Sequence, residues 1–176
     1  MRRSAFTLIE VLVTITIMAI LLLIAVFVIR GGEANARDNE RKTDVSSIAQ
    51  QLETYYTSGS NSTTAIGQYP GLDQVPGTTG VAATDESTTK ATLRDLDWKT
   101  LRAPGVADSS PMSLIAATGT GAQTPTIGQY TYQPLYYDSV NKVYALCTQT
   151  TQSCRKFVIY YTLENGGTQT ITSKNQ

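Results

Sequence analysis

A single carboxylate at the start of a long apolar run is the residue whose position most clearly indicates chemistry. Val11 to Ile29 form a stretch of 19 residues without a charge, and Glu10 directly precedes it. About 20 apolar residues cross a bilayer core as a helix, and an unpaired carboxylate inside that core costs roughly 2.5–3.5 kcal/mol or more. Either Glu10 finds a partner that satisfies its charge, or the run does not lie in a membrane.

Two cysteines are the other candidates for chemistry. Cys147 and Cys154 lie seven residues apart, and they can form a disulfide or remain two thiols. The disulfide is favoured if this part of the chain lies outside the cytoplasm. Such a bridge closes a loop of eight residues, which is worth about 2.5 kcal/mol in the chain-entropy description.

Catalysis is not indicated elsewhere. The chain has no histidine, which removes the commonest general base and a common metal ligand. We find no phosphate-binding loop, no nucleophile elbow and no cysteine–histidine metal pattern. We therefore predict no enzyme activity, no catalytic residue, no metal site and no cofactor. The formal net charge is zero, so nucleic acid is an unfavoured partner, although it is not excluded.

Two interpretations of the N-terminus treat the run as an ordinary targeting segment. A secretory signal would start with Arg2 and Arg3 and be cut after the A-x-A pattern at residues 34–36. Its apolar run would be longer than the usual 7–15 residues, and Glu10 would have no purpose. A simple membrane anchor also fits the run, but basic residues on both flanks leave its orientation open.

A third interpretation accounts for Glu10. The segment "AFTLIEVLVTITIMAILLLIAV", residues 5–26, resembles the N-terminus of type IV pilins and of type II secretion pseudopilins. The resemblance implies that a prepilin peptidase cuts between Ala5 and Phe6, and that the new amino group of Phe6 is N-methylated. Ala5 stands where the family usually has glycine. It further implies that Glu10 pairs with the Phe6 ammonium of a neighbouring subunit during assembly, since two opposite charges relieve each other's desolvation.

The resemblance also implies a fold and a function. We expect an α+β chain in which a long N-terminal helix, membrane-spanning in its first half, packs on a small C-terminal antiparallel sheet. The expected function is that of a structural subunit of a type IV pilus-like filament. Its partners would be copies of itself, the prepilin peptidase, the assembly platform and ATPase, and the membrane before export to the cell surface. A pseudopilin, a DNA-uptake pilus subunit and a secreted protein with a cleaved signal are the alternatives.

Five segments follow from these expectations: a leader at 1–5, a transmembrane and assembly helix at 6–30, an amphipathic helix at 31–58, a Ser/Thr/Gly-rich region at 59–126 and an antiparallel sheet at 127–176. In the amphipathic helix, Val45, Ile48 and Leu52 follow the spacing of one buried face. The charged stretch 37–44 before them is predicted to be solvated or to lie near lipid headgroups and neighbouring subunits. Gly59 is expected to end the helix.

Shorter elements are expected in the rest of the chain. The region 59–126 is predicted to contain one short helix at 88–101, with Trp98 as an anchor in the core or at its rim. Asn61 begins an N-glycosylation triplet, a weak signal. Four strands are predicted near 129–137, 142–148, 156–164 and 168–172, because tyrosine, valine and isoleucine partly alternate there. Asn165-Gly166 favours a two-residue type I′ hairpin turn.

Overall fold

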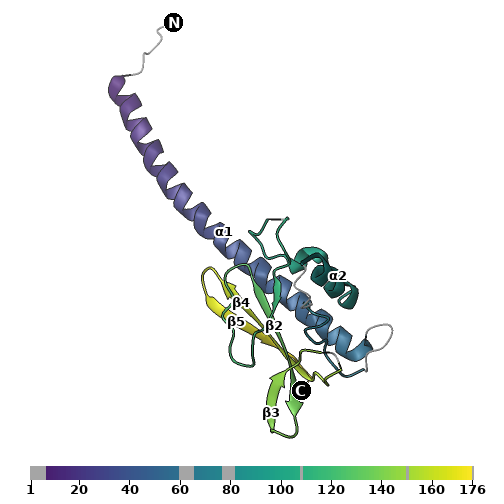
Figure 1. The fold of residues 1–176 in the computed structure, drawn as a ribbon. Coiled ribbons are helices and arrows are strands. Elements are labelled where there is room, and N and C mark those ends of the chain that lie inside the picture. The colour runs from purple at the N-terminus through teal and green to yellow at the C-terminus, as the bar shows by residue number, and fades with distance from the viewer. Residues whose placement is uncertain (1–6, 60–65, 77–81, 108, 150, 176) are drawn as a thin grey trace. The chain divides into compact units, whose positions relative to one another are not determined.

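The protein forms two compact units, Met1–Ala36 and Arg37–Gln176. A computed structural model describes residues 7–59, 66–76, 82–107, 109–149 and 151–175. The elements in chain order are α1 (Leu8–Ser58), α2 (Ala82–Thr92), the 3-10 helix η1 (Trp98–Leu101), β1 (Leu114–Ala116), β2 (Tyr130–Asp138), β3 (Val143–Leu146), β4 (Lys156–Leu163) and β5 (Gly167–Thr172) (Figure 1). The predicted Asn61 triplet lies outside the described residues.

Helix α1 contributes residues to both units and ends where the sequence predicts. Gly59 follows its last residue with a φ of 70°, a conformation that glycine adopts without steric cost. The N–H of Gly59 donates to the carbonyl of Tyr55 over 2.7 Å, which closes the last turn. The predicted helix end is therefore confirmed.

The core of the second unit lies between the later part of α1 and one face of the sheet. Val45, Ile48 and Leu52 are fully buried, as their spacing predicts. They belong to the same core cluster as Tyr132 of β2 and Phe157 of β4. Alternate residues of β4 share the inward face and are all buried: Phe157, Ile159, Tyr161 and Leu163.

The sheet has five strands and is mixed. Its order is β1-β2-β4-β5, and β3 pairs with β2. Strands β2 to β5 pair antiparallel, which confirms the predicted C-terminal arrangement. Strand β1 runs parallel to β2, with Leu114 opposite Tyr130, and sequence reasoning missed it. Three residues are too few to show an alternating pattern, so only the pairing with β2 reveals this strand.

The helix predicted at 88–101 has the wrong bounds. The chain instead forms α2 and then, after a turn, η1. The break has a local cause, because the Asp97 carboxylate accepts the N–H of Lys99 and caps a new helical turn. Leu93 and Leu101 in this stretch are buried, and Leu96 packs against the core.

The hairpin between β4 and β5 exists, but its predicted turn type is wrong. Leu163 pairs with Gly167, so three residues form the loop. The positive φ of 64° falls on Gly167 rather than on Asn165 and Gly166. This is the pattern of a three-residue loop with a left-handed glycine at its end. The Asp38 carboxylate accepts the N–H groups of Glu164 and Asn165, and this contact with α1 fixes the longer loop.

Candidate functional site

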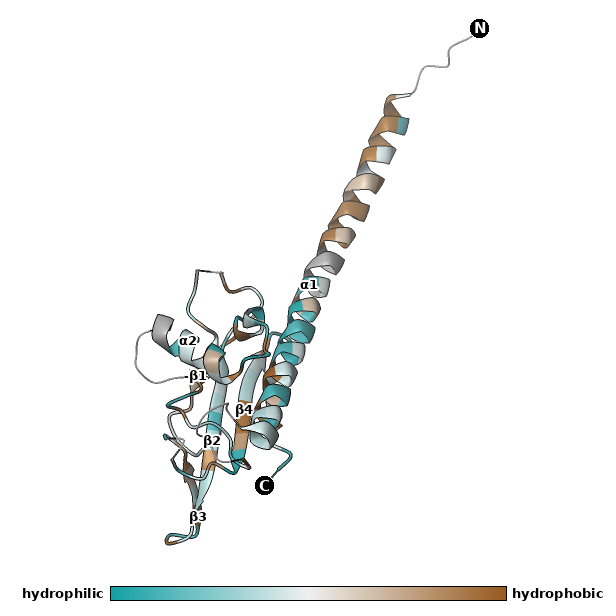
Figure 2. Ribbon diagram, turned by 90° about the vertical axis from the view of Figure 1, so that its right-hand side faces the viewer, coloured by the Kyte–Doolittle hydropathy of each residue, from teal (hydrophilic) through white to brown (hydrophobic). Residues whose placement is uncertain are grey.

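The first part of α1 is apolar on every side. Leu8–Val26 is a helical segment of 19 residues, long and apolar enough to cross a membrane, and none of it is buried within the structure. Figure 2 shows brown, hydrophobic residues along this part of the ribbon. A helix that packs on a soluble core has a polar face, whereas a helix that is apolar all round requires lipid or other apolar helices around it. This segment is therefore a candidate membrane-spanning helix by its length and composition.

Two of the three polar side chains in this segment are satisfied locally. The hydroxyls of Thr14 and Thr16 each donate over 2.8 Å to a carbonyl three residues earlier, that of Val11 and that of Val13. Such back-bonds make threonine compatible with an apolar environment. Within the segment, the carboxylate of Glu10 is the third polar side chain, and it has no such local hydrogen bond.

Glu10 lies in the first turn of α1. Its N–H donates to the carbonyl of Thr7 over 3.1 Å and contacts the Thr7 hydroxyl at 3.4 Å. Thr7 and Glu10 have the three-residue spacing of a capping box, a signal that the sequence interpretation missed. The positive end of the helix dipole favours a carboxylate at this place. Among the described residues, no side chain or ammonium group is paired with this carboxylate.

The predicted cleavage and methylation positions fall outside the described residues. Ala5 and Phe6 both precede residue 7, where the description begins. The cut between them, the N-methylation of Phe6 and its pairing with Glu10 therefore remain predictions.

The two cysteines form a disulfide that belongs to the core. Cys147 and Cys154 are bonded, with their Cα atoms 5.8 Å apart, and both are fully buried. The preceding segment 67–76 flanks the bridge, because the N–H of Leu72 donates to the Cys147 carbonyl and that of Tyr69 to the Cys154 carbonyl. The disulfide therefore stabilises the junction of β3 and β4. Neither of its two cysteines has a free thiol for redox chemistry.

The charged stretch 37–44 is solvated only in part: Glu40 and Lys42 are exposed, but Asp38 and Arg41 belong to a buried ion network. Arg41 is 2% exposed and pairs with Asp38 at 2.9 Å and Glu164 at 2.8 Å. Arg37 also binds Glu164 through two hydrogen bonds of 2.8 Å. The network joins α1 to the turn between β4 and β5. Glu164 lies more than 120 residues from its partners on α1, so no local pattern could predict these contacts.

The network lowers the pKa values of its carboxyl groups. Hydrogen bonds from Arg37 and Arg41 lower the pKa of Glu164 to about 2. For Asp38, burial alone would raise the pKa, but hydrogen bonds from the backbone N–H groups of Glu164 and Asn165 and from Arg41 outweigh it and lower the pKa. Both groups therefore stay ionised at neutral pH, as a structural ion network requires.

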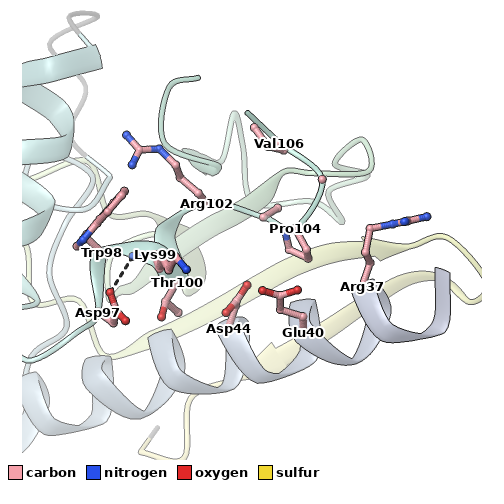
Figure 3. Close-up of a pocket in the computed structure, with 12 residues that line it drawn as sticks. Arg37, Glu40, Asp44, Asp97, Trp98, Lys99, Thr100, Arg102, Pro104 and Val106 are labelled. Carbon is pink, nitrogen blue, oxygen red and sulfur yellow. Dashed lines mark hydrogen bonds between the residues drawn. The ribbon is translucent and has the colours of Figure 1, made fainter. Parts of the chain in front are cut away.

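A pocket of about 410 Å³ lies in the second unit, beside the same stretch of α1 (Figure 3). Glu40 and Asp44 line it from the helix, and residues 97–106 form the facing side. Burial raises the pKa of Asp44 to about 6; the Tyr130 hydroxyl, which donates to it over 3.1 Å, opposes the shift, and the charges of Glu40 and Asp97 add to it. Within the described ranges, no cluster of three His, Cys, Asp or Glu residues is arranged to hold a metal ion.

Trp98 lines this pocket and is 44% exposed. The guanidinium of Arg102 lies 4.8 Å from the centre of its ring and the ammonium of Lys90 lies 5.3 Å away. Cations over the face of an indole are attracted by its electron density. Trp98 is thus an exposed ring contacted by two cations, and it does not belong to the described core cluster or to the residues packed against it, so neither anchor role that the sequence suggested is observed.

The comparisons with known proteins bear on the apolar segment. Residues 1–26 match the family model described as the prokaryotic N-terminal methylation motif. No curated protein and no solved structure matches the chain. The matched region contains the expected cleavage position, Glu10 and the whole apolar segment Leu8–Val26. The chain therefore carries the prokaryotic N-terminal methylation motif, which is the signature of type IV pilin and pseudopilin precursors.

Proposed function

We propose that the protein is a structural subunit of a type IV pilus-like filament and polymerises through its apolar N-terminal helix. One observation carries the proposal. The segment Leu8–Val26 is apolar on every side and exposed, with a single carboxylate in its first turn, and it lies within the methylation motif. A subunit that moves from lipid into a helical fibre needs a segment of this kind.

The physical basis is an exchange of environments. Before assembly the segment lies in the membrane, where lipid tails cover it. In the fibre, the corresponding helices of other subunits replace the lipid. Lipid tails and leucine side chains are similarly apolar, so little hydrophobic free energy is gained or lost in the exchange. Extraction by an assembly ATPase and platform protein is then feasible, and the direction of assembly rests on specific contacts.

Glu10 supplies the specific contact. Once a prepilin peptidase removes residues 1–5, Phe6 bears a new ammonium group four residues before Glu10. Within one chain, the geometry of the helix start places Glu10 beside Thr7. In the fibre, the Glu10 carboxylate pairs with the Phe6 ammonium of a neighbour, and each charge relieves the desolvation of the other. The pair fixes how far one subunit rises against the next.

The globular unit then has a structural rather than a catalytic role, and it is displayed on the fibre surface outside the cell. Type II secretion pseudopilins carry the same N-terminal signature and form the alternative. The two roles differ in the fibre, since a pilin forms long surface filaments and a pseudopilin a short fibre within the envelope. Labelling intact cells on the second unit and imaging the filaments separates them.

The substitution Glu10→Ala tests the proposal. We expect the variant to insert into the membrane normally but to enter filaments on the order of 100-fold less, because the Phe6 ammonium of the neighbour loses its partner in an apolar setting. Glu33→Ala is the matched control, since it removes an exposed carboxylate from the same helix beyond the apolar segment. Normal filaments from the Glu10→Ala variant would contradict the proposal.

A further inference from the structure

The hairpin formed by β2 and β3 exposes an apolar tip. It extends beyond the rest of the sheet (Figure 1). Four of its side chains are exposed although they are large and hydrophobic: Tyr137 (51%), Val140 (85%), Val143 (54%) and Tyr144 (44%). Single exposed apolar residues are ordinary, but a group of four on one protruding hairpin indicates an interaction surface.

The tip is held in one conformation. The Asp138 carboxylate accepts the N–H of Val140 over 2.9 Å and both the N–H and the side-chain amide of Asn141, over 3.2 and 2.6 Å. The rings of Tyr137 and Tyr144 meet edge to face, with centroids 5.6 Å apart. A tip fixed in advance loses little conformational entropy when it binds. It presents Val140 and, at the end of the turn, the cation Lys142, which has no ion-pair partner among the described residues.

The pocket beside Glu40 lies at the other end of the second unit. The side chain of Tyr130, at the start of β2, bonds to Asp44 in the pocket, whereas the hairpin begins at the far end of the same strand. Next along β2, Tyr132 bonds to the carbonyl of Pro70, which follows the end of α1. One end of the unit therefore carries a protrusion and the opposite end carries a hollow.

The charges and walls of the pocket suit Lys142 and Val140 of the tip, whose one carboxylate, Asp138, accepts hydrogen bonds within its own turn. Of its three cations, Arg37 is bound to Glu164 and Arg102 to Glu86. Lys99 is then opposed by three carboxylates that line the pocket: Glu40, Asp44 and Asp97. The apolar walls are provided by Trp98, Pro104 and Val106. A volume of about 410 Å³ lies in the range of roughly 300–1,000 Å³ that holds compact ligands, so it accommodates the side chains of a loop tip.

We propose that the β2–β3 tip of one copy docks into this pocket of the next copy. Val140 contacts the apolar wall at Pro104 and Val106, and the Lys142 ammonium pairs with Glu40. Because two different surfaces meet, the contact is heterologous, and repetition of it produces an open chain rather than a closed dimer. The inference rests on the proposed filament function and adds a second contact, between globular units, to the one made by the N-terminal helix.

Cysteine cross-linking in the full chain tests the contact. We expect Val140→Cys combined with Val106→Cys to give a ladder of covalent multimers on non-reducing gels after oxidation of filaments or membranes. Each single variant should remain monomeric, because a heterologous contact places no second cysteine opposite a single one. Thr170→Cys with Val106→Cys is the matched control, because Thr170 is exposed on β5, away from the tip, and it should give no ladder. Absence of a ladder from the first pair would overturn the inference, and so would efficient dimers from Val140→Cys alone, which indicate a symmetric tip-to-tip contact.

A charge reversal provides the second test. Lys142→Glu should reduce incorporation into filaments on the order of tenfold, because like charges then face each other across the contact. Glu40→Lys in the same chain should restore it. Lys174→Glu, a reversal at another exposed lysine, should have no such effect. If Lys142→Glu assembles normally while Glu10→Ala does not, the docking contact is wrong and the proposed function stands. If Glu10→Ala also assembles normally, the proposed function itself fails.

Discussion

The two parts of α1 differ in whether their charged side chains are paired within the chain. In Leu8–Val26 the lone carboxylate, Glu10, has no partner among the described residues, and the apolar surface around it is fully exposed. In the part that belongs to the second unit, the charges of Asp38 and Arg41 are buried and paired with each other and with Glu164. Within the described residues, the charges of the later part are paired by the chain itself, whereas the carboxylate of the first part is not.

This difference separates a unit whose polar groups are almost all satisfied from a segment whose carboxylate is unpaired among the described residues. In the described part of the chain, the one buried side-chain nitrogen or oxygen without a hydrogen-bond partner is Nε of Arg41. The second unit is thus nearly self-sufficient, with a shared core and a disulfide. No described residue of the first unit belongs to the hydrophobic core cluster. Substitutions should therefore affect folding in the second unit and assembly in the first.

The largest expected effect on folding is at the centre of the core. Phe157→Ala should lower the free energy of unfolding by about 3–5 kcal/mol, because it leaves a cavity beside Tyr69 and Tyr132. Leu22→Ala, on the exposed apolar helix, should leave this value unchanged. Urea unfolding of the detergent-solubilised chain, followed by circular dichroism, measures both. Equal losses for the two variants would remove the contrast between the regions.

The buried ion network gives the next effect. Asp38→Ala should cost about 3 kcal/mol, because it leaves Arg41 buried with one partner fewer and removes the acceptor for two N–H groups of the β4–β5 turn. Glu33→Ala removes an exposed charge of the same helix and should change the stability little. The same urea titration compares them. A loss below about 1 kcal/mol for Asp38→Ala would place the network among ordinary surface ion pairs.

The disulfide contributes somewhat less. Replacing Cys147 and Cys154 together with alanine should lower the free energy of unfolding by about 2.5 kcal/mol, the chain-entropy value for a loop of eight residues. The core should keep its fold, since the antiparallel pairing of β2 with β4 does not depend on the bridge. Unfolding curves recorded with and without a reductant should differ for the native chain and coincide for the double variant.

The smallest effect is the pH dependence caused by Asp44. Its pKa is raised to about 6 in the folded protein, so its contribution to stability is fully present below its unfolded value, near 3.8, and is lost as the pH rises through 6. Asp44→Asn keeps an acceptor for Tyr130 and should be more stable than the native chain at pH 7.5 by about 1 kcal/mol, a value reduced for solvent screening. At pH 4 the two should be equal. A constant difference between them across this range would show that Asp44 does not titrate as described.

The sequence predicted those elements whose causes are local. The apolar segment, the amphipathic spacing of Val45, Ile48 and Leu52, and the C-terminal strands all depend on periodicity within a few residues, and the structure confirms them. The disulfide was one of two open outcomes. It forms because β2–β3 pairing and the return into β4 bring Cys147 and Cys154 together.

The errors arose where distant residues decide the local structure. The turn after β4 has three loop residues because Asp38, on a helix far away in sequence, binds its backbone. Arg41 appeared solvated because its partner Glu164 could not be located from the sequence. Strand β1 exists because β2 offers it an edge. In each case a contact between residues distant in sequence decides the local structure. Composition and residue spacing do not indicate such a contact.

Mass spectrometry of the N-terminus of the mature protein tests the central claim most directly. We expect a chain that begins at Phe6 and bears a methyl group on its amino nitrogen, because in the proposed fibre that ammonium pairs with Glu10 of the neighbouring subunit. Filament subunits that function while retaining Met1 to Ala5 would place the amino group elsewhere and contradict the account.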